Sequence, residues 1–202
     1  TMLYSKEGLE VQVQSTEEQL KVLWEMPLEE LEKQPLAYLY DGITQWSAKA
    51  GLLSTDGTSV VDQLNKHAEE DGGEFIKNLY ASNTDKLPDD IGDMFVCFNN
   101  VYYLCKGKYE NMIRELCSPT ISKFGTAKTL ACVLRFEINN AVYDNLYENF
   151  IVDYFKDLAR LLGFTLEQCL AKAFYDIRNR ELVLHEGIAY KKGTPEYEQY
   201  KK

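Results

Sequence analysis

Two pairs of acidic residues, each spaced three positions apart, lie beside apolar stripes in the first half of the chain. The first pair is Asp71 and Glu74, and the second pair, Asp90 and Asp93, follows a polar turn. On a helix, residues at this spacing lie on one face, one turn apart. Apolar residues at helical spacing accompany both pairs. The stretch therefore predicts two helices that pack by apolar faces and carry carboxylates at the edges of those faces.

The position of Asp71 makes the first pair unusual. Asp71 falls on the same apolar stripe as Leu64 and Phe75, and basic residues nearby in the sequence are few. A carboxylate next to a core-facing stripe is costly unless positive charge compensates it. Four oxygen donors converging from two helices suit Mg²⁺ or Mn²⁺, which prefer hard ligands. Spacing alone also allows two solvated helix faces, because acid pairs are common on helices.

The acid pairs belong to a longer pattern. Residues 70–74 read E-D-G-G-E, and residues 90–93 read D-I-G-D. This pattern resembles the signature of the MazG-like nucleoside triphosphate pyrophosphohydrolases, the all-α NTP pyrophosphatases, which carry E-E-x-x-E, a variable gap and then E-x-x-D. Asp71 stands at the second Glu and Asp90 at the Glu of the second half, each a carboxylate on a shorter side chain. The resemblance is clearest over residues 41–106.

Segments outside the acid pairs extend the resemblance. Residues 45–53 (QWSAKAGLL) are similar to the family's first helix, and the apolar run from Gly92 to Asn100 is similar to its third. Residues 175–180 (YDIRNR) are similar to a basic motif near the end of phage-type relatives, where Lys and Arg face the triphosphate. Here Arg178 replaces the usual Lys.

The resemblance implies an all-α fold, a helical bundle of the all-α NTP pyrophosphatase type, with extra helices at the N-terminus and after the metal-site helices. It implies Mg²⁺, with Mn²⁺ as an alternative, and hydrolysis of a nucleoside triphosphate between its α and β phosphates to a monophosphate and pyrophosphate. A metal that polarises the phosphate and activates water serves this chemistry without a protein nucleophile. Asp71, Glu74, Asp90 and Asp93 would be the catalytic metal ligands. Glu70, one position away, is a candidate to bind a second ion, orient a water or accept its proton.

The same resemblance gives six candidates for substrate binding: Trp46, Lys49, Asn100, Tyr175, Arg178 and Arg180. Trp46 would stack on a base, Asn100 would contact base, sugar or phosphate, and the cations would face the triphosphate. These residues also have structural interpretations. A Trp on an apolar stripe usually belongs to the core, and arginines near a helix C-terminus interact favourably with the helix dipole.

The 202-residue chain is acidic, with a net charge of −10. This charge argues against nucleic-acid polymers and anionic membrane surfaces as main partners, because both select basic patches. A nucleotide ligand is compatible with it, since divalent ions can supply positive charge. The sequence has no apolar run of membrane-spanning length, and its five cysteines form no C-x-x-C pair. We therefore expect buried free thiols and a cytoplasmic protein, in a bacterial host if the origin is a phage.

Patterning together with the resemblance divides the chain into an N-terminal extension over 1–35, a helical domain over 36–182 that resembles the MazG-like fold and a C-terminal arm over 183–202. The arm is expected to be a hairpin or irregular. Helices are expected over 36–53, 58–79, 88–106, 108–116, 126–147, 148–162 and 165–180.

Two local features carry their own expectations. Ser15 is expected to be the N-cap of a helix that runs through the acids Glu17 and Glu18. Gly72 and Gly73 each cost roughly 1 kcal/mol relative to Ala inside a helix. Close approach of another helix or a ligand is therefore expected at these glycines.

Assembly and alternative functions complete the expectations. Broadly apolar helix faces and a high aromatic content favour a homodimer or a higher homo-oligomer. Within enzymes, the alternatives are a dUTPase- or dCTPase-like specialist and an alarmone hydrolase. Outside enzymes, the alternative is a catalytically weak nucleotide-binding or regulatory module, because two signature acids are shortened.

Overall fold

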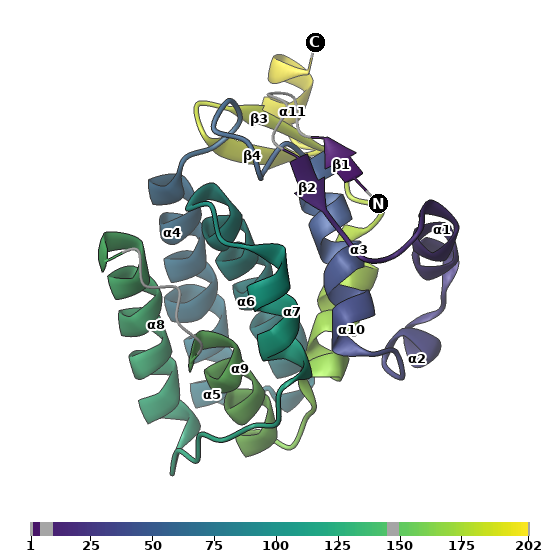
Figure 1. Ribbon diagram of the computed structural model, residues 1–202. Helices are drawn as coiled ribbons and strands as arrows, with labels where there is room; N and C mark the ends of the chain where they lie inside the picture. The colour runs from purple at the N-terminus through teal and green to yellow at the C-terminus, as the bar shows by residue number, and fades with distance from the viewer. Residues whose placement is uncertain (1, 5–9, 145–149, 202) are drawn as a thin grey trace.

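The computed structural model describes residues 2–4, 10–144 and 150–201, and these are predominantly helical (Figure 1), which confirms the all-α expectation. The helical elements are α1 (Glu17–Glu25), α2 (Leu28–Leu31), α3 (Leu36–Lys49), α4 (Val60–Ala68), η1 (Glu69–Phe75), α5 (Ile76–Ala81), η2 (Thr84–Lys86), α6 (Leu87–Leu104), α7 (Tyr109–Cys117), α8 (Ala127–Asp144), α9 (Phe150–Leu161), α10 (Leu166–Ile177) and α11 (Pro195–Tyr200). The junction of the helices expected over 126–147 and 148–162 lies outside the described residues.

Two small antiparallel sheets accompany the helices. Strand β1 (Met2–Tyr4) pairs with β2 (Glu10–Gln12), and β3 (Leu182–His185) pairs with β4 (Ile188–Lys191). The C-terminal arm, which was expected to be a hairpin or irregular, forms the β3–β4 hairpin. Its two-residue turn has positive φ at both positions, 50° at Glu186 and 80° at Gly187, as a tight hairpin turn requires.

Helix ends follow local capping chemistry. Ser59 and Thr165 cap α4 and α10, each through a reciprocal capping box. The N-cap of α1 is Thr16 rather than Ser15. Ser15 instead donates from its backbone N–H and its hydroxyl to the buried Asp41 carboxylate, at 2.9 and 2.6 Å. The N-terminal arm is thereby fixed to α3.

Helix α3 ends at Lys49, four residues earlier than expected. Gly51 adopts a φ of 79°, which favours glycine. The Gly51 N–H bonds to the Ala48 carbonyl, and the Leu52 N–H bonds to the Ser47 carbonyl. These two bonds form a Schellman motif, which satisfies the last carbonyls of the helix and stops it.

Helix α6 lies at the centre of the core and contacts α4, η1 and α10 (Figure 1). Gly92 allows the contact with α10. A Cβ at Gly92 would overlap the Cys169 carbonyl oxygen and lie 2.6 Å from the Cβ of Ala173. The second acid pair is therefore carried by a helix that is tightly held on two sides.

The outer helices cover α6 and the helices packed around it from two sides (Figure 1). Helices α7, α8 and α9 lie on one side, and α1 and α2 lie on the other, against α3 and α10. Leu23 and Leu31 of the N-terminal segment are fully buried in the same core as α6. The edge of the Trp24 ring packs on Phe174, with ring centroids 5.1 Å apart. The expected division at residues 35 and 182 stays a prediction.

Within residues 2–4, 10–144 and 150–201, no helix is long and apolar enough to cross a membrane.

The five cysteines were expected to be buried, but only some of them are. Cys97 and Cys169 are buried, Cys105 is partly buried, and Cys117 and Cys132 are exposed.

Candidate functional site

The first acid-rich segment forms a π-helix, η1, which continues α4 into α5. The Ile76 N–H bonds to the Asp71 carbonyl, five residues earlier, as in π-helical geometry. A π turn holds more residues than an α turn, so the side-chain directions expected from α-helical spacing change within it. Single π turns occur frequently at functional sites.

The structure corrects the expected role of Asp71. Its side chain is fully buried and its Oδ2 accepts a hydrogen bond from Arg135 Nε of α8. Asp71 Oδ1 has no hydrogen-bond partner in the described part of the chain. Asp71 is thus directed to a basic residue on an outer helix. The π-helical geometry of η1 gives a physical reason, because residues three positions apart share one face less closely in a π turn than in an α turn.

Glu70 precedes Asp71 in η1 and pairs with a different cation. Its side chain is almost completely buried, with 7% of the residue exposed, and its Oε1 lies 2.7 Å from Lys66 Nζ. Besides burial, which is the larger effect, the negative charges of Glu70 and Glu74 on η1 raise the pKa of Asp90 and Asp93 on α6. These four residues form an acidic group drawn from η1 and α6, in which Glu74 is exposed to solvent.

The two aspartates that α6 contributes to this acidic group both have a raised pKa. Burial, together with the charges of Asp89, Glu70 and Glu74, raises the pKa of Asp93 to about 8, and the charge of Arg180 opposes this shift. Burial also raises the pKa of Asp90, although Asp90 Oδ2 accepts a hydrogen bond from Asn78 Nδ2 at 2.8 Å. Excess negative charge is therefore concentrated where η1 faces α6.

Two acidic residues that the sequence analysis missed border this group. Asp89 precedes Asp93 by one helical turn, and burial together with the charge of Asp176 on α10 raises the pKa of Asp89 to about 6. Asp176 forms an ion pair with Lys172, with Nζ and Oδ2 2.9 Å apart. The spacing of four positions between Asp89 and Asp93 was a readable signal, as was the aspartate inside the basic motif over 175–180.

Basic residues surround the acids. Arg180, one of the predicted cations, lies close enough to Asp93 to lower its pKa. Lys66 pairs with Glu70, and the charge of Lys86 acts on Asp90. Lys66 and Lys86 were missed, since single lysines on helix surfaces give no motif. Positive side chains able to meet phosphates are thus present next to the carboxylates.

Two predicted substrate contacts belong to the core. Trp46 is only 6% exposed, and its Nε1 donates to the Arg180 carbonyl at 3.4 Å. Asn100 is 2% exposed and donates from Nδ2 to Gln63 Oε1 at 3.0 Å. The prediction that Trp46 stacks on a base is therefore corrected. The prediction for Asn100 would require its buried amide to be uncovered.

Three other candidates interact with the N-terminal segment or with each other. Lys49 is exposed, and its ammonium lies 4.7 Å from the centroid of the Trp24 ring. Arg178 donates from Nη1 to the Met26 carbonyl at 2.5 Å, and its guanidinium lies 4.5 Å from the ring centroid of Tyr175. One nitrogen of the Arg178 guanidinium is therefore engaged by the α1–α2 connection, and the prediction that Arg178 faces a triphosphate stays a prediction.

The donor set suits a divalent cation by its chemistry. Across residues 2–4, 10–144 and 150–201, however, no three His, Cys, Asp or Glu side chains converge closely enough to hold a metal ion as they stand. Like charges hold carboxylates apart unless a cation joins them. The raised pKa of Asp93 reflects this repulsion together with burial. Hard oxygen donors in a group that carries excess negative charge match the ligand preference of Mg²⁺ and Mn²⁺.

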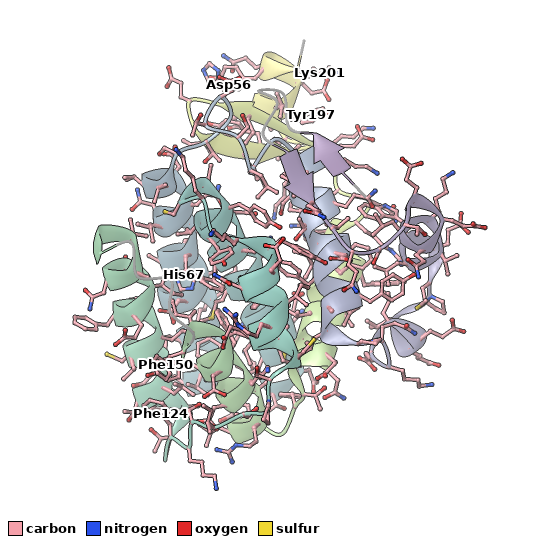
Figure 2. All side chains as sticks on the ribbon, viewed as in Figure 1. Asp56, His67, Phe124, Phe150, Tyr197 and Lys201 are labelled. Carbon is pink, nitrogen blue, oxygen red and sulfur yellow. The ribbon has the colours of Figure 1, made fainter. Side chains whose placement is uncertain are left out.

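A histidine of α4, His67, is buried near Arg135. His67 is buried where α4 faces α8 (Figure 2), and burial together with the nearby charge of Arg135 lowers its pKa to about 4. His67 Nε2 has no hydrogen-bond partner among the residues that the structure describes. His67 is therefore a neutral packing residue next to the Asp71–Arg135 pair.

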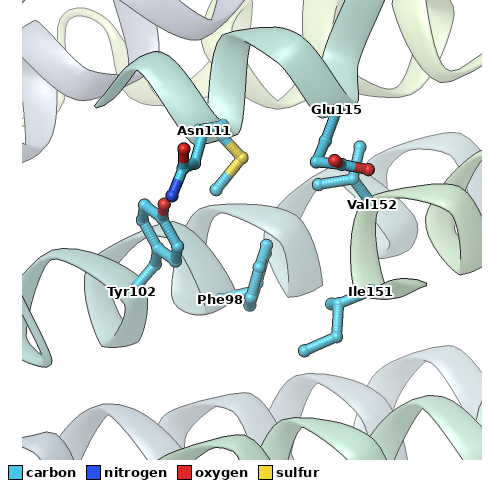
Figure 3. A pocket seen from close by; sticks show the side chains of 7 residues that line it. Phe98, Tyr102, Asn111, Glu115, Ile151 and Val152 are labelled. Atoms are coloured by element: carbon cyan, nitrogen blue, oxygen red, sulfur yellow. The ribbon is translucent and has the colours of Figure 1, made fainter. Parts of the chain in front are cut away.

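The cavities are separate from the acids. A cavity of about 20 Å³ lies between α6, α7 and α9 (Figure 3). It is lined mainly by apolar side chains such as Phe98, Met112 and Ile151. A groove of about 370 Å³ next to β2 and α7 is lined by Gln12, Gln14, Tyr109, Glu110, Ile113 and Arg114. The cavity between α6, α7 and α9 is far too small for a nucleotide.

Comparisons with protein-family models, with curated proteins and with solved structures find no match to this chain. The resemblance to the MazG-like pyrophosphohydrolases therefore depends on the residues themselves.

Proposed function

We propose that this protein is a Mg²⁺-dependent nucleotide pyrophosphohydrolase of the MazG-like type, which cleaves a nucleoside triphosphate between the α and β phosphates. The products are a nucleoside monophosphate and pyrophosphate. One observation carries the proposal: η1 packs on α6, and the charges of Glu70 and Glu74 on η1 add to the effect of burial in raising the pKa of Asp90 and Asp93 on α6. These residues keep the order and approximate spacing of the family signature, with Glu70 in the place first given to Asp71.

The residues of this chain divide the task by charge. Glu70, Glu74, Asp90 and Asp93 would hold the metal. A bound Mg²⁺ or Mn²⁺ would supply polarisation of the α-phosphate and a lowered pKa of the attacking water. Arg180 lies next to Asp93 and contacts the triphosphate, whose charge exceeds what one divalent ion neutralises. No side chain forms a covalent bond to the substrate.

The proposed setting follows from the same chemistry. The substrate is a free nucleotide rather than a nucleic-acid polymer, since the chain carries a net charge of −10. We infer a cytoplasmic homodimer. Light scattering tests the oligomeric state independently of activity.

Substitution of the proposed ligands tests the function. We expect Glu70→Gln and Asp93→Asn each to lower pyrophosphate release from dNTPs and Mg²⁺ by at least about 100-fold, more than the loss typical of outer-shell partners. The matched control is Glu69→Gln. Glu69 is adjacent to Glu70 and also pairs with Lys66, but its side chain is 63% exposed. Loss of activity in Glu69→Gln equal to that in Glu70→Gln would reject the ligand assignment.

A second candidate is a nucleotide-binding module with little or no turnover. It is favoured by the observation that, within the described ranges, no three acidic side chains converge on a common point. Equilibrium dialysis with a dNTP and Mg²⁺ separates the candidates. Tight binding without release of pyrophosphate supports the module, and turnover supports the enzyme.

A further inference from the structure

We propose that the solvent-facing side of α8 is a self-association surface, on which α8 of a second copy of this chain packs with Phe136 at the centre. We call its four residues the outer face of α8: Thr129, Cys132, Phe136 and Asn139. This inference rests on the homodimer included in the proposed function, because it names the surface of that dimer. It does not depend on the reaction.

Helix α8 lies at the outer edge of the bundle (Figure 1) and has two different sides. Its inner side is packed in the core, where Leu130 and Leu134 are fully buried. All four residues of the outer face are exposed, and Phe136 is 62% exposed. Their spacing of three, four and three places them in one line along the helix, as in the seam of a coiled coil. The outer face therefore has the layout of a surface that packs on another helix.

The outer face carries no charge, although 27% of the residues in the chain are charged. Two basic residues beside the face are engaged within the chain. Arg135 pairs with Asp71 of η1, and Lys128 Nζ lies 4.0 Å from the ring centroid of Tyr80 on α5. The solvent side of a surface helix is usually charged or polar. Depletion of charge around an exposed aromatic ring is instead typical of the core of a protein interface.

The charge and the position of Phe136 favour a second copy as the partner. Each copy carries a net charge of −10, so two copies repel each other unless they meet at an uncharged surface. A basic partner would select acidic surfaces, which the outer face does not offer. Phe136 lies near the middle of α8, which runs from Ala127 to Asp144. A two-fold axis next to Phe136 therefore brings the same face of both copies together along most of the helix.

The size of the surface requires neighbouring elements to take part. The 18 residues of α8 span about 27 Å, and a helix is about 10 Å wide. A standard interface buries about 800 Å² on each partner, which is more than one face of this helix provides. Tyr80 of α5 is 66% exposed and contacts Lys128 near the start of α8. Tyr80 therefore extends the surface beyond the outer face.

Sedimentation velocity over a range of protein concentrations tests the surface. Phe136→Glu places a charge at the centre of the outer face and opposes like charges in the dimer. The control is Val22→Glu, because Val22 is also an exposed apolar residue, 54% exposed, but lies on α1 at the other side of the bundle (Figure 1). Circular dichroism of both variants verifies that their helices are intact.

We expect the unchanged protein and Val22→Glu to sediment with twice the mass of one chain. Phe136→Glu should weaken self-association at least about 30-fold, as the loss of a central hot-spot residue does. It should sediment as a single chain at concentrations where the control is a dimer.

Alkylation of cysteines by iodoacetamide locates the contact independently. Cys132 belongs to the outer face, whereas Cys117, which is also exposed, lies at the end of α7. The rate constant for Cys132 should fall as the concentration of the unchanged protein rises and the dimer forms. The rate constant for Cys117 should stay the same, and in Phe136→Glu neither should depend on protein concentration.

Two outcomes would overturn the proposal in different ways. If the unchanged protein sediments as a single chain at every concentration, both the homodimer and this surface are overturned. If it is a dimer that Phe136→Glu does not weaken, and Cys132 is alkylated equally fast at all concentrations, the surface is overturned and the homodimer stands. Release of pyrophosphate, assayed separately, decides the proposed reaction in either case.

Discussion

Glu70 and Asp71 are neighbours in the chain, yet their side chains meet different cations on different sides of the helix. Glu70 pairs with Lys66 of α4, and Asp71 pairs with Arg135 of α8. The assignment of roles within the E-D-G-G-E segment therefore depends on the rotation of a single turn. An α-helical interpretation favours Asp71 as the ligand, and the π turn favours Glu70.

His67 is expected to make the protein sensitive to acid. Its pKa is 6.5 in an ordinary environment and about 4 in the folded protein. Between these values the unfolded chain binds more protons, so stability present above pH 6.5 is lost as the pH falls towards 4. The shift corresponds to at most about 3 kcal/mol.

Chemical denaturation of the unchanged protein and of His67→Gln at pH 7 and pH 4 measures this contribution. The unchanged protein should lose up to about 3 kcal/mol more of its unfolding free energy than the variant over that interval. Equal losses in both proteins would show that His67 titrates normally.

At the scale of elements, two glycines near the acids have different roles. Gly92 lies where α6 meets the Cys169 carbonyl, so a methyl group there overlaps backbone that cannot move cheaply. Gly73 of η1 has nothing within 4 Å of the position of a Cβ among the described residues. Within the described part of the chain, no helix approaches Gly73 closely, and at Gly72 the approach amounts to ordinary contact with Arg135, whereas the approach of a ligand to these glycines stays a prediction.

Alanine substitutions should separate these glycines. Gly92→Ala should destabilise the protein by about 1–3 kcal/mol, as overpacking does, despite the better helix propensity of Ala. Gly73→Ala should be neutral or stabilise the protein by up to about 1 kcal/mol. Denaturant unfolding measures both. A destabilisation by Gly73→Ala as large as that by Gly92→Ala would contradict the packing seen in the structure.

Most helices could be predicted because their signals are local. Ser59 and Thr165 cap helices through side chains within three residues, and apolar spacing gives the buried faces of α6 and α10. The π turn could not be predicted, since no pattern of propensity distinguishes it from an α turn. The Asp71–Arg135 pair joins positions 64 residues apart, and sequence spacing carries no information on such a contact.

At the scale of the whole molecule, the N-terminal segment is packed onto the end of α10. Trp24 Nε1 donates to the Arg178 carbonyl at 3.0 Å, and Arg178 donates to the Met26 carbonyl. The basic motif over 175–180 is thus divided between two tasks. Arg178 holds the N-terminal segment, and Arg180 lies near Asp93. Sequence similarity alone places both arginines at the substrate.

Matched substitutions test this division. Arg178→Met should lower the unfolding free energy by about 1–2 kcal/mol, because it removes a hydrogen bond from a charged donor, and should leave KM within about twofold. Arg180→Met should raise KM for the nucleotide about tenfold, with little change in stability. Steady-state kinetics and unfolding of both variants measure the two effects. The reverse pattern would return Arg178 to the substrate site.

The identity of the reaction products tests the central claim most directly. Phosphorus NMR of a dNTP mixture incubated with the protein and Mg²⁺ should show a monophosphate and pyrophosphate in equal amounts. EDTA or Glu70→Gln should abolish both signals. Orthophosphate with a diphosphate, or equal turnover by Glu70→Gln, would contradict the account.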